Sequence, residues 1–379
     1  MSGIDRRICI VHLAFDHASV RALNALLQSE SQSEHWWWVN PSKTLKDGTF
    51  AWHNTLNTKE VLEKLSVADA VFIHRLKGEN MNWLERIPAH LPVIWASWGD
   101  DYYRVLNALN RSLFLPRTAA LNALLGKMSI TVQRIGNAFG GAEKKFVSAC
   151  QRVDAVSTLM REEAPFFGVF ATPMPKTYPS LYNPTPPESD LQWCTEDPGR
   201  VLIGTNASNT SNHLDVIVQL RKAKPPAHAR FGAGLSYGSP RYAKSIDFLG
   251  RALLSNWHAQ FEHLPRQAYS EWLRTHSVLV MNNVRTQGTG VLVMALWYGL
   301  RIVLRPDAHL TPFLQQQGFV FDLIPPQGWN NSLYHPLNEK DRMHNRNIAA
   351  KVFGKHQQLS SIQALVSDLQ TGKLKRRCP

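Results

Sequence analysis

Apolar runs alternate with helical patterns along most of this chain, and that alternation restricts the folds it can adopt. In the first half, four runs have the length of buried strands: residues 7–15, 35–41, 69–76 and 91–98. Residues 153–167 repeat the order of a strand followed by a helix. Short apolar runs that are bounded by turn residues and joined through helices are typical of a parallel sheet covered on both faces.

The second half begins the same order again. Four further strands are predicted, at residues 200–206, 229–238, 277–283 and 301–305. Helices are predicted between or after them, at residues 240–254, 267–276 and 288–298, and two amphipathic helical patterns follow from about residue 338. The chain therefore contains two successive series of strands and helices.

A proline-rich stretch, residues 172–199, separates the two series. It has few periodic apolar positions, which is typical of a linker. A chain of 379 residues also exceeds the usual size of a single core. We predict an α/β protein with two Rossmann-like domains, at residues 1–185 and 186–335, followed by C-terminal helices at 336–379 that can pack back on the first domain.

The charge balance suggests an anionic partner. The chain has 42 Lys and Arg against 29 Asp and Glu, a net charge of +13. Such an excess favours nucleic acid, an acidic membrane face or a phosphorylated substrate. The basic residues are scattered, apart from a run at 373–377, which argues against a dedicated nucleic-acid module.

The cysteines and the apolar stretches indicate where the protein resides. Cys9, Cys150, Cys194 and Cys378 lie far apart without metal-ligand spacing, as expected of unpaired thiols in a reducing compartment. The first apolar run is too short for a signal peptide, and no run is long enough to span a bilayer. We expect a cytoplasmic protein whose membrane contact is peripheral.

The stretch VRTQGTG, residues 284–290, connects a predicted strand to a helix that starts near Gly288. Glycines let backbone amides approach an anion closely, and the start of a helix presents unsatisfied N–H groups with a favourable dipole. Arg285 adds a guanidinium fork suited to phosphate oxygens. The stretch predicts a phosphate site, although a strand-to-helix connection without a ligand has the same pattern.

Two further loops follow predicted strands in the second half. GTNASNTSNH, residues 204–213, offers hydroxyls, amides and the flexible Gly204, all useful around a diphosphate. A loop that only caps a helix has the same composition. Tyr237 precedes Gly238 at the end of the next strand, where its ring can contact a sugar or a base, or simply pack.

Candidate catalytic groups lie in the first half. Asp100 and Asp101 follow the strand at 91–98. Because burying an unpaired carboxylate is costly, neither is expected to be a core residue, and one of them could serve as a general base that deprotonates an acceptor hydroxyl. Capping of the following helix is the alternative role. His12 and His74 also lie at or near strand ends, where a structural histidine is the alternative interpretation.

Five stretches in this order resemble one family of bacterial glycosyltransferases: SWGDDYY, LIGTNASNTSNH, LSYGSPRYAKSI, LPRQAYSEWL and VRTQGTG. That family transfers 4-acetamido-4,6-dideoxygalactose from a dTDP-sugar to a lipid-linked disaccharide in enterobacterial common antigen assembly. The resemblance extends from the first strand to about residue 315. It implies the GT-B fold, with two Rossmann-like domains facing across a cleft, the donor in the C-terminal domain and the acceptor approaching from the N-terminal one.

The loops and the resemblance together indicate a donor-binding set: Gly204, Thr205, Asn206, Tyr237, Gly238, Arg285, Gln287, Gly288, Thr289 and Gly290. Some of these positions depart from the family pattern. Thr205 and Asn206 replace an Asn-Ser pair, and Thr289 fills a position that is often aliphatic, so the donor sugar and its nucleotide stay open. Asp100 stands where the family often has a small residue, which makes Asp101 the preferred catalytic base, with His12 and His74 as alternatives.

The resulting hypothesis is a glycosyltransferase of the hexosyltransferase type. It would move a sugar from a dTDP-linked acetamido-dideoxyhexose, or a similar nucleotide-diphosphate sugar, to a hydroxyl of a lipid-linked glycan in bacterial surface polysaccharide assembly. An anionic membrane surface, the inner face of the cell membrane, is the expected third partner. No cofactor, metal or nucleic acid is expected. The alternatives are a non-catalytic nucleotide or nucleic-acid binding protein of the same architecture, and a glycosyltransferase with a protein acceptor.

Overall fold

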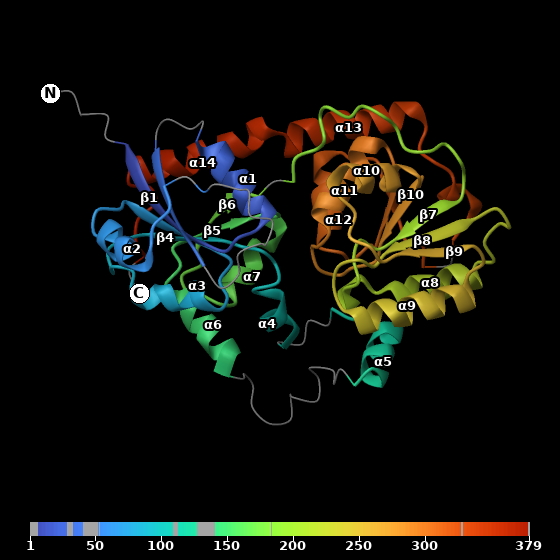
Figure 1. Ribbon diagram of the computed structural model, residues 1–379, viewed down its shortest axis with the longest axis horizontal. Helices are drawn as coiled ribbons and strands as arrows, with labels where there is room; N and C mark the ends of the chain where they lie inside the picture. Colours follow the sequence, from blue (N-terminus) through green and yellow to red (C-terminus); the bar gives the residue numbers. More distant parts are fainter. Residues whose placement is uncertain are drawn as a thin grey trace. The chain divides into compact units, whose positions relative to one another are not determined.

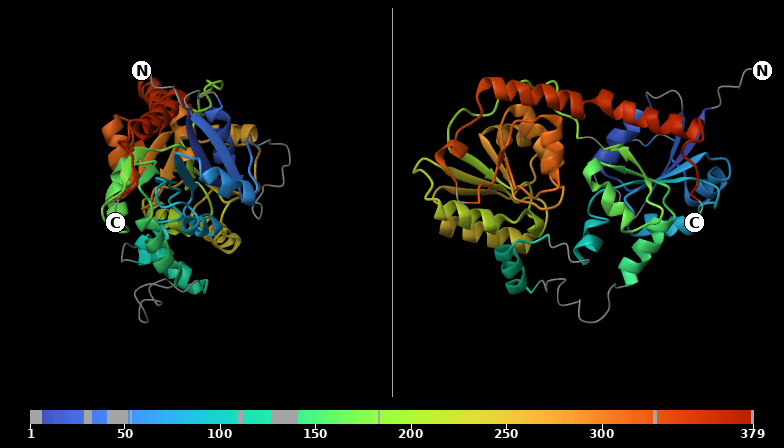
Figure 2. Two further views of the ribbon diagram at one scale, coloured as in Figure 1. Left: turned by 90° about the vertical axis from the view of Figure 1, so that its left-hand side faces the viewer. Right: turned by 180° about the vertical axis from the view of Figure 1, so that it is seen from behind.

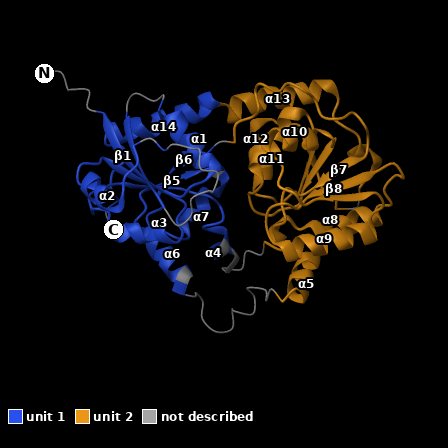
Figure 3. Ribbon diagram, viewed as in Figure 1, with its two compact units in different colours: residues 1–106, 138–183, 355–379 blue, residues 107–137, 184–354 orange. Residues whose placement is uncertain are grey.

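The computed structural model describes residues 7–28, 33–40, 52, 54–108, 113–126, 141–182, 184–326 and 329–377. The chain divides into two compact units (Figure 3). Unit 1 comprises residues 1–106, 138–183 and 355–379, and unit 2 comprises residues 107–137 and 184–354.

Unit 1 is built around a parallel sheet. Its described strands are β1 (Ile8–Ala14), β2 (Ser33–Val39), β3 (Ala70–His74), β4 (Val93–Ala96), β5 (Ala155–Thr158) and β6 (Lys176–Pro179). They are ordered β2-β1-β3-β4-β5-β6. Its helices are α1 (Ala18–Leu27), α2 (Thr58–Leu65), α3 (Glu79–Asn82), α6 (Gly141–Gln151), α7 (Ala164–Gly168) and α14 (Lys355–Gln370), while α4 (Tyr103–Ala108) crosses the division at residue 106.

Helices cover both faces of this sheet (Figures 1 and 2). Alternate residues of a strand point to opposite faces, so Ile8, Ile10 and Ala14 of β1 share one face. They pack with apolar side chains of α1 and α14 in one core cluster. On the other face Trp95 of β4 contacts Phe146 of α6. Because β1 is buried on both sides, every one of its residues is buried, and its sequence is nearly continuously apolar.

Unit 2 contains a second parallel sheet. Its described strands are β7 (Arg200–Ile203), β8 (Arg230–Gly234), β9 (Trp257–Gln260), β10 (Val278–Met281), β11 (Arg301–Leu304) and β12 (Asp322–Leu323), ordered β12-β11-β10-β7-β8-β9. This is the Rossmann order, with the switch point between β7 and β10. Its helices are α5 (Pro116–Leu124), α8 (His213–Lys222), α9 (Pro240–Leu253), α10 (Arg266–Arg274), α11 (Thr289–Tyr298), α12 (Leu310–Gln317) and α13 (Glu339–Phe353).

The division into units differs from the predicted domains 1–185, 186–335 and 336–379. The first crossing into unit 2 comes after residue 106, and α5 packs against α8 of unit 2. The C-terminal helices separate at Gly354, where α13 contacts α11 of unit 2 and α14 contacts β1 and β6 of unit 1. Helical periodicity alone could not assign these segments, because it shows only that a helix has a buried face.

The proline-rich stretch is also more structured than predicted. Residues 176–179 form β6 at the edge of the unit 1 sheet, where a proline is tolerated because its missing N–H faces no further strand. The strand β9 was likewise not predicted. Cys9, Cys150 and Cys194 are buried and form no disulfide among the described residues, and Cys378 lies outside those residues. No helix in the described ranges has the length and apolar character needed to cross a membrane.

Candidate functional site

The predicted donor loops follow the two strands at the switch point of unit 2. In an open α/β sheet, the loops beyond the carboxyl ends of the strands diverge there and leave room for a ligand. Gly204 follows β7 with φ of 69°, and its amide donates to the carbonyl of Val280 in β10 at 2.8 Å. A Cβ at this glycine would lie 2.3 Å from Nε2 of His213, so Gly204 also makes room for a buried imidazole.

The loops after β7 and β8 are joined by an isolated bridge between Ala207 and Gly238. The amide of Ala207 donates to the carbonyl of Tyr237 at 2.6 Å, and the amide of Ser239 donates to the carbonyl of Ala207 at 3.0 Å. A Cβ on Gly238, whose φ is 128°, would lie 2.5 Å from that carbonyl oxygen. Glycine is therefore required for the two backbones to meet.

A polar network connects the same loop to the loop after β10. The Oγ1 of Thr210 donates to Oε1 of Gln287 at 2.5 Å and accepts from Nε of Arg285 at 3.2 Å. Gln287 in turn donates to Oγ of Ser211 at 2.8 Å. Since one edge of the Arg285 side chain is held in this way, its guanidinium has a defined position at the loop surface.

These loops enclose a cavity of about 530 Å³, lined by Asn206, Ala207, Ser208, Asn209, Ser236, Tyr237, Gly238, Ser239 and Arg285. Of the predicted donor residues, Asn206, Tyr237, Gly238 and Arg285 thus share one cavity. The Tyr237 residue is 75% exposed, so its ring is available to a ligand. The three serines and Asn209 of the lining were not among the predicted donor residues, although their positions after predicted strands were a usable signal.

The remaining predicted donor residues lie around the start of α11. Gly288 is its N-cap with φ of 66°, and no side chain of the described residues caps the helix, so Thr289 and Gly290 begin it. A Cβ on Gly288 would lie 2.3 Å from Oγ1 of Thr205. That hydroxyl is buried and has no hydrogen-bond partner within the described part of the chain. The helix start therefore presents backbone N–H groups beside an unsatisfied hydroxyl.

Two other residues of the loop after β7 have structural roles. The side chain of Asn212 donates to the carbonyls of Leu113 and Asn282 and accepts from the amide of Leu115. His213 is fully buried against Tyr242. Both belong to the stretch LIGTNASNTSNH, and in the structure their buried side chains position that loop.

In unit 1, Asp101 is 3% exposed, and its carboxylate accepts from four N–H groups. Oδ2 accepts from the indole of Trp95 at 2.8 Å and from the amide of Leu76 at 3.1 Å, while Oδ1 accepts from the amides of Tyr102 and Trp98 at 3.1 and 3.4 Å. Burial, and then the charge of Asp100, raise the pKa of Asp101 to about 6. This geometry organises the loop after β4.

Asp100, by contrast, is partly exposed and forms ion pairs with Arg75 and Lys77. The two adjacent carboxylates therefore have different surroundings. The expectation that neither is a core residue is wrong for Asp101, because its N–H donors offset the cost of burial.

The predicted alternatives His12 and His74 are both fully buried. His12 is hydrogen-bonded through Nδ1 to Nε2 of His74 at 2.8 Å and through Nε2 to Nδ1 of His35 at 2.9 Å. Burial lowers the pKa of His12 well below its ordinary value, with the neighbouring histidines adding to the effect, and lowers that of His74 to about 3. Neither imidazole can contact a substrate directly.

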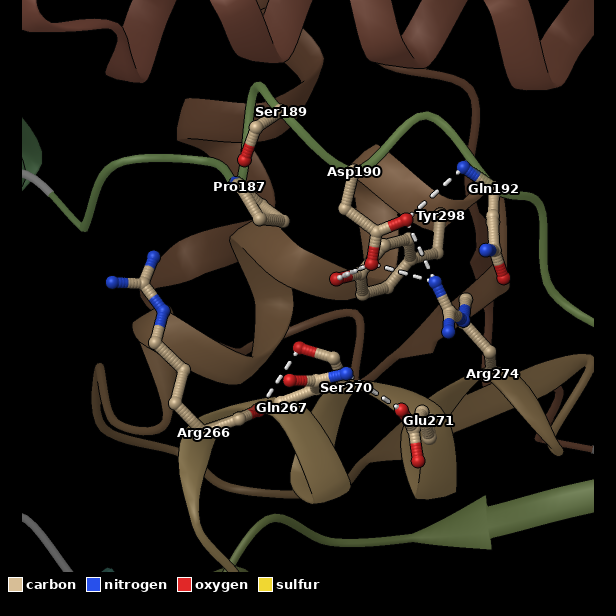
Figure 4. A pocket seen from close by; sticks show the side chains of 10 residues that line it. All are labelled: Pro187, Ser189, Asp190, Gln192, Arg266, Gln267, Ser270, Glu271, Arg274 and Tyr298. Atoms are coloured by element: carbon tan, nitrogen blue, oxygen red, sulfur yellow. Dashed lines mark hydrogen bonds and ion pairs between the residues drawn. The ribbon is translucent and has the colours of Figure 1, made fainter.

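A second cavity of unit 2, of about 510 Å³, lies between residues 187–192, α10 and the end of α11 (Figure 4). Asp190 is held there by Arg274 at 2.6 Å and by the hydroxyl of Tyr298 at 3.0 Å. The side chain of Arg266 extends on the other side of the cavity (Figure 4). Because its central charges are already paired, this cavity offers less to an anion than the loops around Arg285.

Across the described ranges, no group of three or more His, Cys, Asp or Glu side chains could hold a metal ion. In unit 1, His12, His35 and His74 form a line of hydrogen bonds and do not converge on one point.

Comparisons with known proteins identify the fold. No family model matches the chain, and no curated protein matches it either. Among solved structures, Anabaena Alr3699/HepE in complex with UDP and glucose is 11% identical with a TM-score of 0.59, and the match covers 96% of this chain and all of that one.

Two more solved structures have similar scores. A mutant of the Thermobaculum terrenum O-GlcNAc transferase is 12% identical with a TM-score of 0.58, covering 97% of this chain and 67% of that one. The sucrose-phosphate synthase of Thermosynechococcus elongatus is 11% identical with a TM-score of 0.57, and the match covers 97% of this chain and 98% of that one. The fold is that of the GT-B glycosyltransferases, with two Rossmann-like domains.

Proposed function

We propose that the protein is a glycosyltransferase that uses a nucleotide-diphosphate sugar as donor. The observation that carries this proposal is the cavity at the switch point of unit 2, where three loops, a positioned guanidinium and an exposed tyrosine ring surround one space. The GT-B fold supports it, because members of that fold bind such donors in the corresponding domain.

The leaving diphosphate would be stabilised by Arg285 and by the backbone amides at the start of α11. Both are fixed by the fold before a ligand binds, so they need no reorganisation as charge develops on the leaving group. The buried hydroxyl of Thr205, which no described residue satisfies, supports a polar ligand near this helix start. The exposed ring of Tyr237 would contact the sugar or the base.

For the finer assignment, we propose a hexosyltransferase with a dTDP-linked acetamido-dideoxyhexose, or a similar donor, and a lipid-linked glycan as acceptor. The five ordered motifs support it, together with the net charge of +13. A cationic protein is attracted to the anionic inner face of a bacterial membrane, where a polyprenyl-diphosphate glycan would be found. The proposed location is therefore cytoplasmic and peripheral to that face.

Asp101, His12 and His74 stay candidates for proton transfer, but their burial restricts how they could act. A general base must lie within hydrogen-bond reach of the hydroxyl that it deprotonates. Since all three side chains are buried, a proton could reach them only through another group.

The proposal is tested by ligand titration of the full chain. Thermal shift and calorimetry with dTDP, UDP, GDP and ADP should give stabilisation by at least one of the four, because a ligand that binds only the native state raises its stability. At a ligand concentration of one hundred times Kd the expected gain is about 2.7 kcal/mol. Binding of a short oligonucleotide without binding of any nucleoside diphosphate would refute the donor site.

The proposed association with an anionic membrane is tested separately. Flotation with vesicles that contain phosphatidylglycerol should retain the protein at low salt and release it as salt rises, since screening weakens this attraction. Equal flotation with neutral vesicles would contradict an electrostatic origin.

A further inference from the structure

Three histidines of unit 1 form a continuous hydrogen-bonded chain across its sheet. Alternate strand residues share a face, so His35 of β2, His12 of β1 and His74 of β3 point to the same side. His12 pairs with Trp37 of β2 and with Phe72 of β3. His35 lies two residues before Trp37, and His74 lies two residues after Phe72, so both are on the same face as His12. The chain therefore runs diagonally toward the carboxyl end of β3.

Every ring nitrogen of these three histidines has a hydrogen-bond partner. Nε2 of His35 is 2.9 Å from Oγ of Ser33, and the two links between imidazoles are 2.9 and 2.8 Å. Nδ1 of His74 is hydrogen-bonded to the phenol of Tyr182. The ring of Trp37 stacks on His12 with centroids 4.0 Å apart, and His12 is fully buried.

Two opposite sets of donor and acceptor assignments fit these hydrogen bonds, and both keep the imidazoles neutral. In one, Tyr182 donates to Nδ1 of His74, and each Nε2–H donates to the next group until Ser33 accepts. In the other, every donor and acceptor is exchanged, and Tyr182 accepts. A neutral imidazole has one donor and one acceptor nitrogen, so each set keeps all three histidines uncharged. Burial favours those neutral forms, which agrees with the lowered pKa of His12 and of His74.

Tyr182 is the partly exposed end of this hydrogen-bonded histidine chain. The strand order of unit 1 places its switch point between β1 and β3, the strands of His12 and His74, and ligands of open α/β sheets bind beyond the carboxyl ends at that point. Tyr182 also contacts Trp98, with ring centroids 4.8 Å apart, and Phe15 and His17 contact the same indole. The indole N–H of Trp98 is buried without an acceptor among the described residues.

We propose that Tyr182 accepts the proton of the acceptor hydroxyl during glycosyl transfer, and that the histidines behind it take up its phenolic proton in exchange. This inference rests on the proposed function. The catalytic residue is Tyr182, which would touch the acceptor, while the histidines position it and relay the proton. The aromatic side chains around it would supply apolar faces for a sugar ring.

The acceptor oxygen forms the new bond to C1 of the donor sugar, and the bond between C1 and the diphosphate oxygen breaks, with its electron pair leaving on the diphosphate. The O–H bond of the acceptor breaks, and its proton goes to the Tyr182 oxygen. The phenolic proton moves to His74, one proton crosses each link, and His35 holds the extra proton as an imidazolium only until the product leaves, because burial favours the neutral form. Return of that proton to solvent through Tyr182, after the product leaves, restores the starting state.

The test compares Tyr182→Phe with Tyr178→Phe. Tyr178 is a matched control, because its phenol donates to Asp368 and is not part of the chain. Turnover is followed as nucleoside diphosphate released from dTDP-glucose or UDP-glucose, with methyl glycosides as acceptors. Tyr182→Phe should lower kcat about 100-fold or more, the usual contribution of a general base, with KM for the nucleotide sugar within threefold. A kcat within threefold of wild type overturns the catalytic role.

Nitrogen NMR of ¹⁵N-histidine-labelled protein gives a readout that does not depend on turnover. It reports the tautomer of each imidazole, and Tyr182→Phe should change the signals of all three histidines, whereas Tyr178→Phe should change none. A change at His74 alone overturns the relay. A wild type that neither binds a nucleoside diphosphate nor releases one overturns the proposed function, and with it the catalytic role of Tyr182. Nucleotide binding with unresponsive histidines overturns the relay alone.

Discussion

Gly288 and Thr205 meet at the start of α11, so closely that a Cβ on the glycine would lie 2.3 Å from the threonine Oγ1. The backbone of Gly288 also has φ of 66°, a conformation that glycine adopts readily and other residues do not. Both conditions arise where the loop after β10 turns into the helix whose amides are proposed to bind the diphosphate.

Replacing Gly288 should therefore destabilise unit 2. Gly288→Ala is expected to lower the free energy of unfolding by at least about 1 kcal/mol from the left-handed backbone alone, with the contact to Thr205 adding to the loss. Urea unfolding measures the change. Thr205→Ala in the same chain should recover part of it, because it removes Oγ1 and Cγ2 from the contact.

Gly290→Ala is the control for this prediction. Gly290 lies inside α11, and an added Cβ would meet nothing closer than Pro184 at 4.0 Å. Alanine in a helix should stabilise by up to about 1 kcal/mol relative to glycine. Equal stability of Gly288→Ala and wild type would show that the turn at Gly288 is not constrained in this way.

Arg285 should determine affinity for the nucleoside diphosphate. Arg285→Ala is expected to weaken binding at least about tenfold, since a hydrogen bond to a charged group contributes about 1.5–3 kcal/mol. Arg285→Lys should restore only part of the affinity, because an ammonium cannot reproduce the guanidinium fork. Isothermal titration with the nucleotide found in the ligand panel gives the three values.

The matched control for Arg285→Ala is Arg241→Ala. Arg241 is exposed on α9 and does not line the cavity, yet its removal changes the net charge equally. An Arg241→Ala variant that loses as much affinity as Arg285→Ala would mean that overall charge, and not a positioned guanidinium, attracts the ligand.

The order of strands and helices could be predicted because β1, β3, β4, β7 and β10 are buried on both faces and therefore read as continuous apolar runs. That residues from separate loops line one cavity could be predicted for a related reason. Loops that follow adjacent parallel strands meet at one edge of the sheet, so Arg285 and Asn206 come together from distant positions.

The histidine chain could not be predicted. It depends on the register of β1 with β2 and β3, which single-sequence patterns do not contain, and its end, Tyr182, lies in a stretch whose prolines indicate a linker. The surroundings of Asp101 were equally hidden. Its four N–H donors come from β4, from the loop after β3 and from its own turn, and only the folded chain brings them together.

The buried histidines should make the protein sensitive to acid. His12 and His74 have lowered pKa values in the folded state, while in the unfolded chain they bind protons near pH 6.5. Their contribution to stability is therefore complete above pH 6.5 and is lost as the pH falls toward 3. Each neutral histidine adds up to about 1.4 kcal/mol per pH unit to that loss.

Unfolding in urea between pH 7.5 and 5 tests this expectation. The free energy of unfolding should decrease as the pH is lowered, and the exposed His258→Asn variant should show the same slope as wild type. A stability that is flat from pH 7 to pH 5 in both proteins would contradict neutral, buried imidazoles.

The contribution of Asp101 to stability should change with pH in the opposite direction, over a narrower pH range. Its pKa of about 6 lies above the ordinary value of 3.8, so the folded protein holds this proton more tightly than the unfolded chain does. Its contribution to stability is present below pH 3.8 and is lost as the pH rises through 6, by about 3 kcal/mol in all.

In Asp101→Asn the titration is absent, but the amide NH₂ would face N–H groups that need an acceptor, such as the indole of Trp95. We expect a loss of about 1–3 kcal/mol at pH 7, the cost of leaving buried donors unsatisfied. Between pH 4 and pH 6 the stability of the variant should then rise more steeply with pH than that of wild type, since only the histidines still titrate. Parallel pH profiles for the two proteins would mean that Asp101 is already ionised throughout this range. In that case the four N–H donors lower the pKa of Asp101 by more than burial raises it.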